Sequence, residues 1–245
     1  MSEPVFFLDG AALVAGERLV LDGPEGRHAA DVRRLRVGEV LVVTDAAGQA
    51  ARAEVLEAAR GSLVLGVLDR WSEPDPQPRL VVVQALAKGD RGETAVETLT
   101  EVGVDVIVPW AAARSVTRWS AERAPKALER WRSAARESAK QSRRIRWPEV
   151  RPLGTTADVV AILGGAALAL VLHEEAGERL ASAEVPPAGD VVLVVGPEGG
   201  ITPEERAAFT AAGARPVRLG STVLRTSTAG TAAAAVVLAR TARWS

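Results

Sequence analysis

The sequence predicts a two-part protein in which a small β-barrel precedes a larger α/β domain built on a parallel sheet. Short apolar runs separated by turns fill residues 1–71, a proline-rich stretch follows at 72–78, and strands then alternate with helices from 79 to 245. Alternation of strands and helices is typical of a parallel sheet that helices cover on both faces. We therefore expect a barrel domain, a linker and an α/β domain with these boundaries.

The first 71 residues contain the short runs expected of an all-β domain. These segments read PVFFLD, ERLVL, EVLVVTD, ARAEVLEA and SLVLGVLD, and turns rich in glycine or aspartate separate them. The next stretch, WSEPDPQPR (71–79), holds three prolines in nine residues. Because each proline restricts the residue before it to extended backbone, this stretch is expected to be a linker.

From residue 79 the pattern changes. RLVVVQAL (79–86) is a continuous apolar run, as expected of a strand buried on both faces, and Val96, Leu99 and Val102 recur after it at helical spacing. Further strands are predicted at 104–110, 166–172, 190–196 and 214–220, and further helices at 122–142 and 227–240. The first of these helices has an apolar stripe made of Leu128, Trp131, Ala135 and Ala139.

Composition excludes several classes of site. The 245 residues include no cysteine and only two histidines, so disulfides, thiolate zinc sites and cysteine nucleophiles are excluded, and no metal site is predicted. Tyrosine is absent, which disfavours an RNA-binding sheet that stacks bases on paired aromatic rings. No apolar stretch is long enough to span a membrane and no secretory signal pattern is present, so we expect a cytoplasmic protein.

Charge is distributed unevenly along the chain. The net charge is only −1, yet the segment Arg114–Arg146 contains eleven basic residues against three acidic ones. A solvated helix face is the ordinary explanation of such a run. The strong excess of cations favours a surface that binds nucleic acid, because neutralising phosphates releases their counterions.

Three loops are the candidate ligand site, since ligands of open parallel sheets bind outside the carboxyl ends of the strands. These loops read LHEEAG (172–177), GPEGGITPEE (196–205) and LGSTVLRTSTAG (219–230). Thr202 and Glu205 form a capping-box pattern, which explains half of the middle loop as a helix start. The glycines before Thr202 stay unexplained, and backbone without side chains can approach a ligand closely. The sequence has no P-loop and no GxSxG elbow, and no dinucleotide fingerprint lies at the first strand of the α/β domain.

Two of these loops carry a specific resemblance. VVGPEGGITPEE followed by RLGSTVLRTSTA resembles the paired motifs of the 16S ribosomal RNA uracil-N3 methyltransferase family (RsmE-type) of the SPOUT superfamily. VQALAKGDRGE, TEVGVDVIVPWAAARSV and ESAKQSRRIRWPEV match further motifs of that family, and GRHAADVRRLRVGEVLVVTD is similar to its small PUA-like barrel. The resemblance spans nearly the whole chain in order. The chain departs from the family at Ser227, where glutamate is common, and at Thr98, where lysine is common.

The resemblance implies a SPOUT-type trefoil-knotted parallel-sheet domain after a PUA-like β-barrel. It also implies a homodimer that binds S-adenosylmethionine as methyl donor between the three loops, without a metal. The expected reaction is methylation of N3 of a uridine in 16S ribosomal RNA, within the small ribosomal subunit. Nothing in the hydrophobic periodicity predicts the knot, which rests on the resemblance alone.

Arg225 is the expected catalytic residue. Removing the N3 proton of uracil leaves negative charge on the flanking carbonyls, and a guanidinium beside the donor can stabilise that charge. The alternative for Arg225 is a structural ion pair. The general base stays open among Glu198, His173 and Glu174, and Glu198 is preferred as a residue that orders its loop or contacts the ligand. The residues expected to hold the donor are Leu172, His173, Glu174, Gly196, Pro197, Glu198, Gly200, Ile201, Leu219, Gly220, Val223, Leu224, Arg225 and Thr226.

Basic and polar residues of both parts are expected to contact RNA phosphates, which position a substrate without reading its sequence. They are Arg27, His28, Arg33, Arg34, Arg36, Lys88, Arg114, Gln141, Arg143 and Arg144. Two other functions are considered. One is 2′-O-ribose methylation on the same fold, disfavoured because residues 219–240 contain no asparagine; the other is a ribosome-assembly factor that binds RNA without catalysis.

Overall fold

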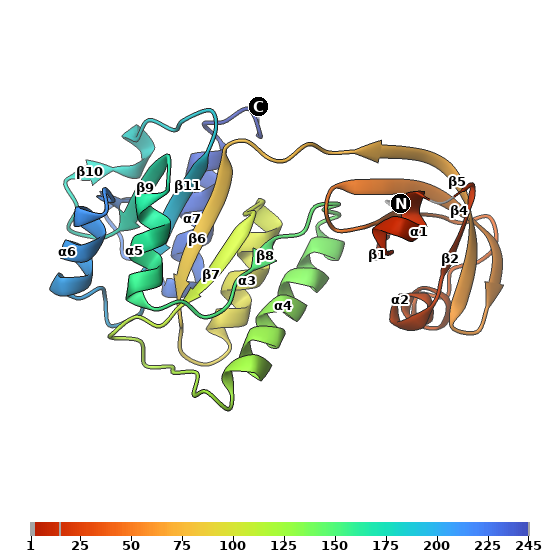
Figure 1. Cartoon of the computed structure of the whole chain (residues 1–245), viewed down its shortest axis with the longest axis horizontal. Helices are drawn as coiled ribbons and strands as arrows, with labels where there is room; N and C mark the ends of the chain where they lie inside the picture. The colour runs from red at the N-terminus through yellow and green to blue at the C-terminus, as the bar shows by residue number, and fades with distance from the viewer. Residues whose placement is uncertain (1–2, 15, 245) are drawn as a thin grey trace. The chain divides into compact units, whose positions relative to one another are not determined.

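The computed structural model describes residues 3–14 and 16–244, which form two compact units. The first unit contains the chain up to Asp75 together with residues 139–147, and the second contains residues 76–138 and 148 onward. Figure 1 shows a β-rich part and a part in which helices flank a sheet.

The first unit is built on a five-stranded mixed sheet in the order β1-β3-β4-β5-β2. Its strands are β1 (Val5–Phe7), β2 (Arg18–Leu21), β3 (Val40–Thr44), β4 (Gln49–Ala59) and β5 (Ser62–Ser72). The pair β1–β3 is parallel, and the other neighbours are antiparallel. All five strands occur where the sequence predicts them, and alternate residues bury their side chains in one apolar core.

The prediction that this part is all β was wrong, because three short helical segments interrupt it. They are α1 (Gly10–Val14), α2 (Gly23–Arg27) and a π-helical turn (His28–Val32). A helix of five residues shows little periodicity in the sequence, so only Pro24 at the start of α2 marked it. Gly26 is needed there, since a Cβ atom would lie 2.5 Å from the carbonyl oxygens of Leu21 and Gly61.

Residues 139–147 pack with the first unit, although the sequence analysis placed them in the second domain. The Thr44 hydroxyl donates to the Ile145 carbonyl at 2.7 Å, and Ile145 is buried in a small apolar cluster of this unit. Lys140 forms an ion pair with Glu25 at 3.0 Å. The sequence could not predict this packing, because it depends on tertiary contacts. One buried isoleucine and a few charged residues do not identify a partner about 100 residues away in the chain.

The second unit is built on a seven-stranded sheet in the order β10-β12-β9-β11-β6-β7-β8, with every neighbouring pair parallel. Its strands are β6 (Arg79–Ala85), β7 (Val106–Trp110), β8 (Glu149–Val150), β9 (Leu168–Leu172), β10 (Glu178–Arg179), β11 (Asp190–Val195) and β12 (Arg215–Arg218). The predicted parallel sheet is confirmed. The two-residue strands β8 and β10 were not predicted, being too short for a pattern.

Helices cover both faces of this sheet (Figure 1). They are α3 (Arg91–Val102), α4 (Ala124–Gln141), α5 (Thr156–Gly164), α6 (Pro203–Ala211) and α7 (Thr226–Leu238), with a 3-10 turn at Leu180–Ser182. Trp131 of α4 packs in the same core cluster as residues of α3 and α7, whereas Phe209 of α6 packs with residues of α5 in the cluster on the opposite face. Helix α5 was not predicted. None of the described helices is long and apolar enough to cross a membrane.

Candidate active site

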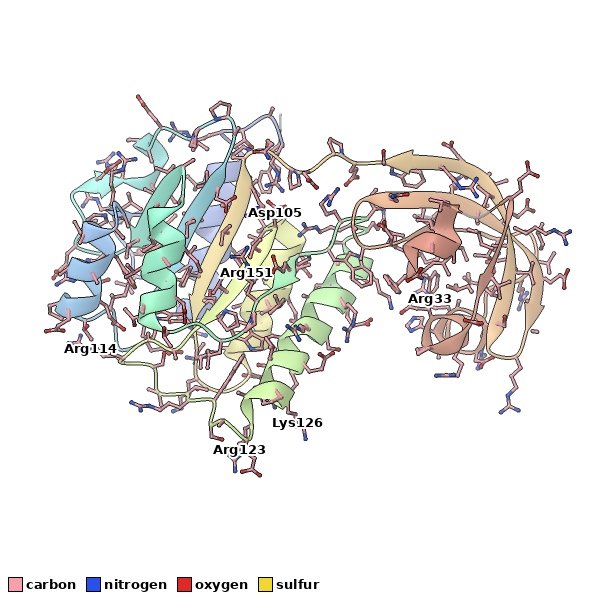
Figure 2. The ribbon with its side chains drawn as sticks, in the orientation of Figure 1. Arg33, Asp105, Arg114, Arg123, Lys126 and Arg151 are labelled. Atoms are coloured by element: carbon pink, nitrogen blue, oxygen red, sulfur yellow. The ribbon has the colours of Figure 1, made fainter. Side chains whose placement is uncertain are left out.

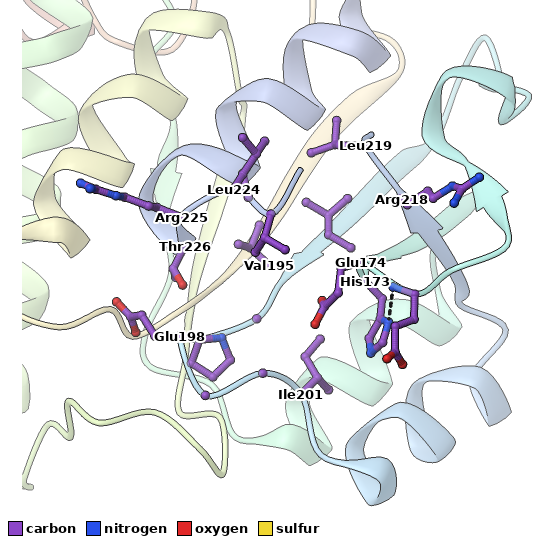
Figure 3. A pocket seen from close by; sticks show the side chains of 18 of the residues that line it. His173, Glu174, Val195, Glu198, Ile201, Arg218, Leu219, Leu224, Arg225 and Thr226 are labelled. Atoms are coloured by element: carbon purple, nitrogen blue, oxygen red, sulfur yellow. Dashed lines mark hydrogen bonds between the residues drawn. The ribbon is translucent and has the colours of Figure 1, made fainter. Parts of the chain in front are cut away.

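The loops after β9, β11 and β12 line one pocket of about 640 Å³. This volume is within the range of small-molecule sites, about 300–1,000 Å³. All fourteen residues that the sequence analysis assigned to the donor line the pocket. Parallel strands bring their carboxyl ends to one edge of the sheet, which is why loops so distant in sequence meet here (Figure 3).

Each glycine of the middle loop is required for a different structural reason. A Cβ atom at Gly196 would lie 2.8 Å from Ile201, and one at Gly199 would lie 2.9 Å from the Arg114 carbonyl oxygen. Gly200 has a φ of +74°, which side chains rarely adopt. Gly220 in the last loop is exposed, with open space where a Cβ would be. The expectation that these glycines all admit a ligand is therefore too simple, because Gly196 and Gly199 make room for the protein's own atoms.

Glu198 joins three segments of the unit. Its Oε1 atom accepts a hydrogen bond from the backbone N–H of Lys88 at 3.2 Å and lies 3.7 Å from Nη1 of Arg91. Arg91 lines the pocket and begins α3, so the carboxylate links the β6–α3 loop to the loop after β11. A carboxylate held in this way orders the loop to which it belongs.

His173 is surrounded by hydrogen-bond donors. Its Nδ1 atom accepts from the backbone N–H of Glu175 at 3.2 Å, and its Nε2 atom lies 3.1 Å from Nη1 of Arg206. A neutral imidazole accepts at one nitrogen only, so the ring cannot satisfy both donors. The Nε atom of Arg206 is buried and has no hydrogen-bond partner among the described residues. An acceptor on a ligand in this pocket would satisfy the donor that the ring leaves free.

Arg225 precedes the first turn of α7, and the backbone N–H groups of Thr228 and Ala229 both donate to its carbonyl oxygen at 2.9 Å. Its side chain is exposed and, among the described residues, forms no ion pair or hydrogen bond through its guanidinium. Figure 3 shows the side chain extending away from His173 and Glu174. The structural ion pair considered as an alternative for Arg225 is thus not present in the described part of the chain.

Several arginines line the pocket. Arg91, Arg114 and Arg218 line it together with Arg225, and Arg114 donates to the Gly199 carbonyl oxygen at 3.3 Å. Arg91, Arg206 and Arg218 also line the pocket but were not among the residues predicted for the site. Arg218 ends β12 and directly precedes the matched loop, so a wider reading of that motif would have included it. Arg91 lies inside the matched motif VQALAKGDRGE, so the same wider reading would have included it. Arg206 directly follows the motif VVGPEGGITPEE, and nothing in the sequence indicated that it turns toward the pocket.

The residues predicted to contact RNA are distributed over both units. Lys88 and Arg114 are exposed in the second unit, and Arg114 is the one that also lines the pocket. The other eight are in the first unit, where most are exposed; Figure 2 labels Arg33, which extends from the barrel. His28 is half-buried and makes an edge-on contact with the Phe6 ring, with centroids 5.9 Å apart. Its ring therefore serves packing as well as any RNA contact.

No cluster of three or more potential metal ligands occurs among the residues that the structure describes.

Comparisons with known proteins agree with this geometry. A family model described as an RNA methyltransferase domain matches residues 73–238, and one described as an RNA methyltransferase PUA domain matches residues 21–68. A protein of Mycobacterium bovis named ribosomal RNA small subunit methyltransferase E is 50% identical over 234 residues, covering 94% of this chain and 89% of its own length. The chain belongs to the ribosomal RNA small subunit methyltransferase E family.

More distant members of the family are similar over most of their length. The Bacillus subtilis protein of that name is 29% identical over 217 residues, covering 85% of each chain. The Neisseria gonorrhoeae methyltransferase E, solved bound to S-adenosylmethionine, has a TM-score of 0.85 at 28% identity and covers 97% of both chains. A Legionella pneumophila methyltransferase, solved with the same molecule, has a TM-score of 0.87 at 26% identity, covering 98% of this chain and 99% of its own. These likenesses confirm the predicted fold class, a PUA-like domain before a SPOUT-type domain.

Proposed function

We propose that this RNA methyltransferase takes the methyl group of S-adenosylmethionine and transfers it to N3 of a uridine in 16S ribosomal RNA. The observation that carries the proposal is the pocket at the carboxyl ends of β9, β11 and β12, which all fourteen expected donor-binding residues line. Relatives of similar fold were solved with S-adenosylmethionine, and the curated relatives act, by name, on the RNA of the small ribosomal subunit.

The pocket has features that fit this donor. Leu172, Ile201, Leu219 and Leu224 supply apolar side chains for the adenosine, while the open space at Gly220 lets backbone approach it. One of the two N–H donors that face His173 lacks an acceptor on the neutral ring, and S-adenosylmethionine carries several acceptor atoms. When bound, S-adenosylmethionine supplies a methyl group already activated by its sulfonium charge. The chain's own task is to hold a uracil in line with that group.

Arg225 is the residue that we assign to the chemistry. Loss of the N3 proton leaves negative charge on the two flanking carbonyl oxygens of the uracil, and a guanidinium with no protein partner can turn to meet that charge. Glu198 is assigned to loop order because its carboxylate already accepts from Lys88 and faces Arg91. His173 and Glu174 remain the candidates for the base, since both line the pocket.

The RNA is proposed to contact cations of each unit: Lys88 and Arg114 in the second unit, where Arg114 lines the pocket, and the basic residues predicted for the first unit. We further propose that the enzyme acts as a homodimer with a trefoil knot, on RNA within the small subunit in the cytoplasm. Small side chains in α7, such as Gly230, Ala233 and Ala234, are buried within their own unit, so the homodimer rests on the family resemblance alone.

Two measurements test the proposal. Titration calorimetry should detect binding of S-adenosylmethionine or of its demethylated product. If neither binds, the proposal that S-adenosylmethionine is the methyl donor is wrong. Nuclease digestion of ribosomal RNA methylated by the enzyme should place the new methyl on a uracil base. A methyl on the ribose would favour 2′-O-methylation, and RNA binding without any transfer would favour an assembly factor.

A further inference from the structure

Gln84 is a polar residue at a position where the sheet is otherwise apolar. It lies near the carboxyl end of β6, between Val195 of β11 and Pro109 of β7, and its side chain is fully buried. Burying an amide costs free energy unless its atoms form hydrogen bonds. A leucine or methionine would fill the same volume without that cost, so the amide needs a specific explanation.

The contacts of Gln84 point to α7. Its Nε2 atom donates to the Thr226 carbonyl oxygen at 3.2 Å and to the Ala85 carbonyl oxygen at 3.3 Å. Its Oε1 atom is buried without a hydrogen-bond partner among the described residues. The opposite amide orientation would place Oε1 against two carbonyl oxygens, so the donor side must face Thr226.

Helix α7 packs against this amide without spare room. A Cβ atom at Gly230 would lie 3.3 Å from Oε1 of Gln84 and 3.2 Å from side-chain carbons of Leu99 and Val195. Thr226 is the first residue of α7, it lines the pocket, and it directly follows Arg225. The hydrogen bond from Gln84 therefore ties the first turn of α7 to β6, an inner strand of the sheet.

We propose that Gln84 is a positioning residue for methyl transfer: by holding the Thr226 carbonyl, it sets the direction in which Arg225 leaves the first turn of α7. The proposal rests on the role given to Arg225 under the proposed function. It also explains why an amide with half of its hydrogen-bonding capacity unused is kept in the core, since only a donor can hold a carbonyl.

The first test is Gln84→Met, which keeps the volume and removes the donor. We expect kcat to fall about tenfold, while the affinity for S-adenosylmethionine measured by calorimetry and the KM for RNA stay within about twofold. In the ligand-free protein, the amides of Thr228 and Ala229 should exchange hydrogen faster. A purely structural Gln84 would lower the melting temperature but leave kcat and these amides unchanged, which overturns the proposal.

The second test is a double-mutant cycle with Arg225→Ala. If Gln84 acts through Arg225, the double variant should be no slower than Arg225→Ala within about twofold, whereas multiplied losses contradict the proposal. Thr98→Val is the matched control. It removes a 2.7 Å hydrogen bond between the hydroxyls of Thr98 in α3 and Thr231 in α7, and Thr231 lies beyond the first turn of α7. Its kcat should match that of the parent protein.

A variant of a buried residue can fail to fold. In that case Gln84→Asn, which keeps the amide but shortens its reach by one methylene, takes the same measurements with the same expected results. Failure of the proposed function is distinguishable, because then the parent protein itself neither binds S-adenosylmethionine nor methylates RNA. The exchange rates of Thr228 and Ala229 would still decide whether Gln84 holds α7.

Discussion

Arg225 stands out at the residue scale because it is a cation at the site without a partner of its own in the described chain. We predict that Arg225→Ala lowers kcat by about 100- to 1,000-fold, as removal of one group that stabilises developing charge does in other enzymes. Binding of S-adenosylmethionine should change little, since the pocket keeps its apolar walls. Steady-state kinetics and calorimetry measure the two effects. Arg225→Lys is the control for charge, and full turnover by Arg225→Ala would remove the residue from the mechanism.

Glu198 is the residue whose interpretation the structure sharpens most. Its carboxylate accepts from Lys88 and faces Arg91. We predict that Glu198→Gln, which keeps an acceptor oxygen for Lys88, lowers activity less than about tenfold and leaves the pH–rate profile unchanged. Loss of a general base would instead cost about 100- to 10,000-fold. A loss of that size, or a missing limb in the pH–rate profile, would assign Glu198 to proton transfer.

At the scale of elements, Glu205 holds the middle loop to its surroundings. As the predicted capping box requires, its side chain accepts from the Thr202 backbone N–H at 3.0 Å, and the Thr202 hydroxyl accepts from the Glu205 N–H at 3.2 Å. The buried carboxylate also accepts from the backbone N–H of Ala113 at 2.8 Å and faces the Thr156 hydroxyl at 3.3 Å. One side chain therefore connects α6 with α5 and with the loop after β7.

This geometry predicts an order of stabilities. Thr202→Ala should cost about 1 kcal/mol of unfolding free energy, as loss of a helix cap does. Glu205→Ala should cost about 2–3 kcal/mol, because it also removes the hydrogen bonds that this buried carboxylate accepts from the Ala113 N–H and the Thr156 hydroxyl. Urea unfolding measures both. Glu204→Ala is the matched control, as this neighbouring carboxylate is exposed, and equal losses for Glu204→Ala and Glu205→Ala would contradict the argument.

The starts of β6 and β11 carry a pH-dependent contribution. Arg79 and Asp190 form a two-fold contact at 2.8 and 2.7 Å, and this hydrogen bonding lowers the pKa of Asp190. A lowered carboxyl pKa stabilises the fold above the ordinary value of about 3.9, and the stabilisation is lost as pH falls through the lowered pKa.

The pair is partly exposed, so its contribution should be small. We predict that Asp190→Asn lowers the unfolding free energy by about 0.5–1 kcal/mol at pH 7, and that the difference shrinks as the pH falls through the lowered pKa of Asp190. Urea unfolding at a series of pH values measures it. A difference that stays constant down to pH 2 would show that the charge of Asp190 is not its source.

The elements show where sequence reasoning succeeds. Strand β6 and helix α3 were predicted because each repeats its pattern over many residues, as Val96 and Leu99 do in α3. Helix α2 was missed because five residues hold barely more than one turn. The packing of Ile145 beside Val42 could not be predicted, since a single apolar residue does not identify its partner.

At the scale of the whole molecule, the part of the site that could be predicted is the set of loops that the parallel sheet places side by side. Parallel strands place the loops that follow Leu172, Val195 and Arg218 at one edge, so local motifs sufficed to name the pocket. Arg206 was not predictable, because it projects from α6 toward His173 only after that helix has packed on the sheet. The sequences of the loops do not show which residues of a neighbouring helix will reach the site.

Charge is the property of the whole chain that most directly affects its proposed substrate. Arg114–Arg146 has a net charge of +8, so the rest of the chain carries −9. Some of these cations are paired within the protein, such as Arg130 with Glu93 at 3.4 Å, whereas Arg123 and Lys126 extend outward where α4 begins (Figure 2). Cations without a protein partner are the ones free to neutralise phosphates.

RNA affinity should therefore fall steeply with salt, and each phosphate contact should contribute about 0.7–0.9 to the slope of log K against log salt. Arg143→Ala, which removes an exposed residue expected to contact RNA, should reduce that slope by about one contact and weaken binding to all RNA sequences alike. Arg179→Ala is the matched control, because Arg179 is exposed in β10, outside both the pocket and the basic segment. Equal slopes for these two variants would mean that Arg143 does not contact phosphate, and a sequence-dependent loss would assign it to base recognition.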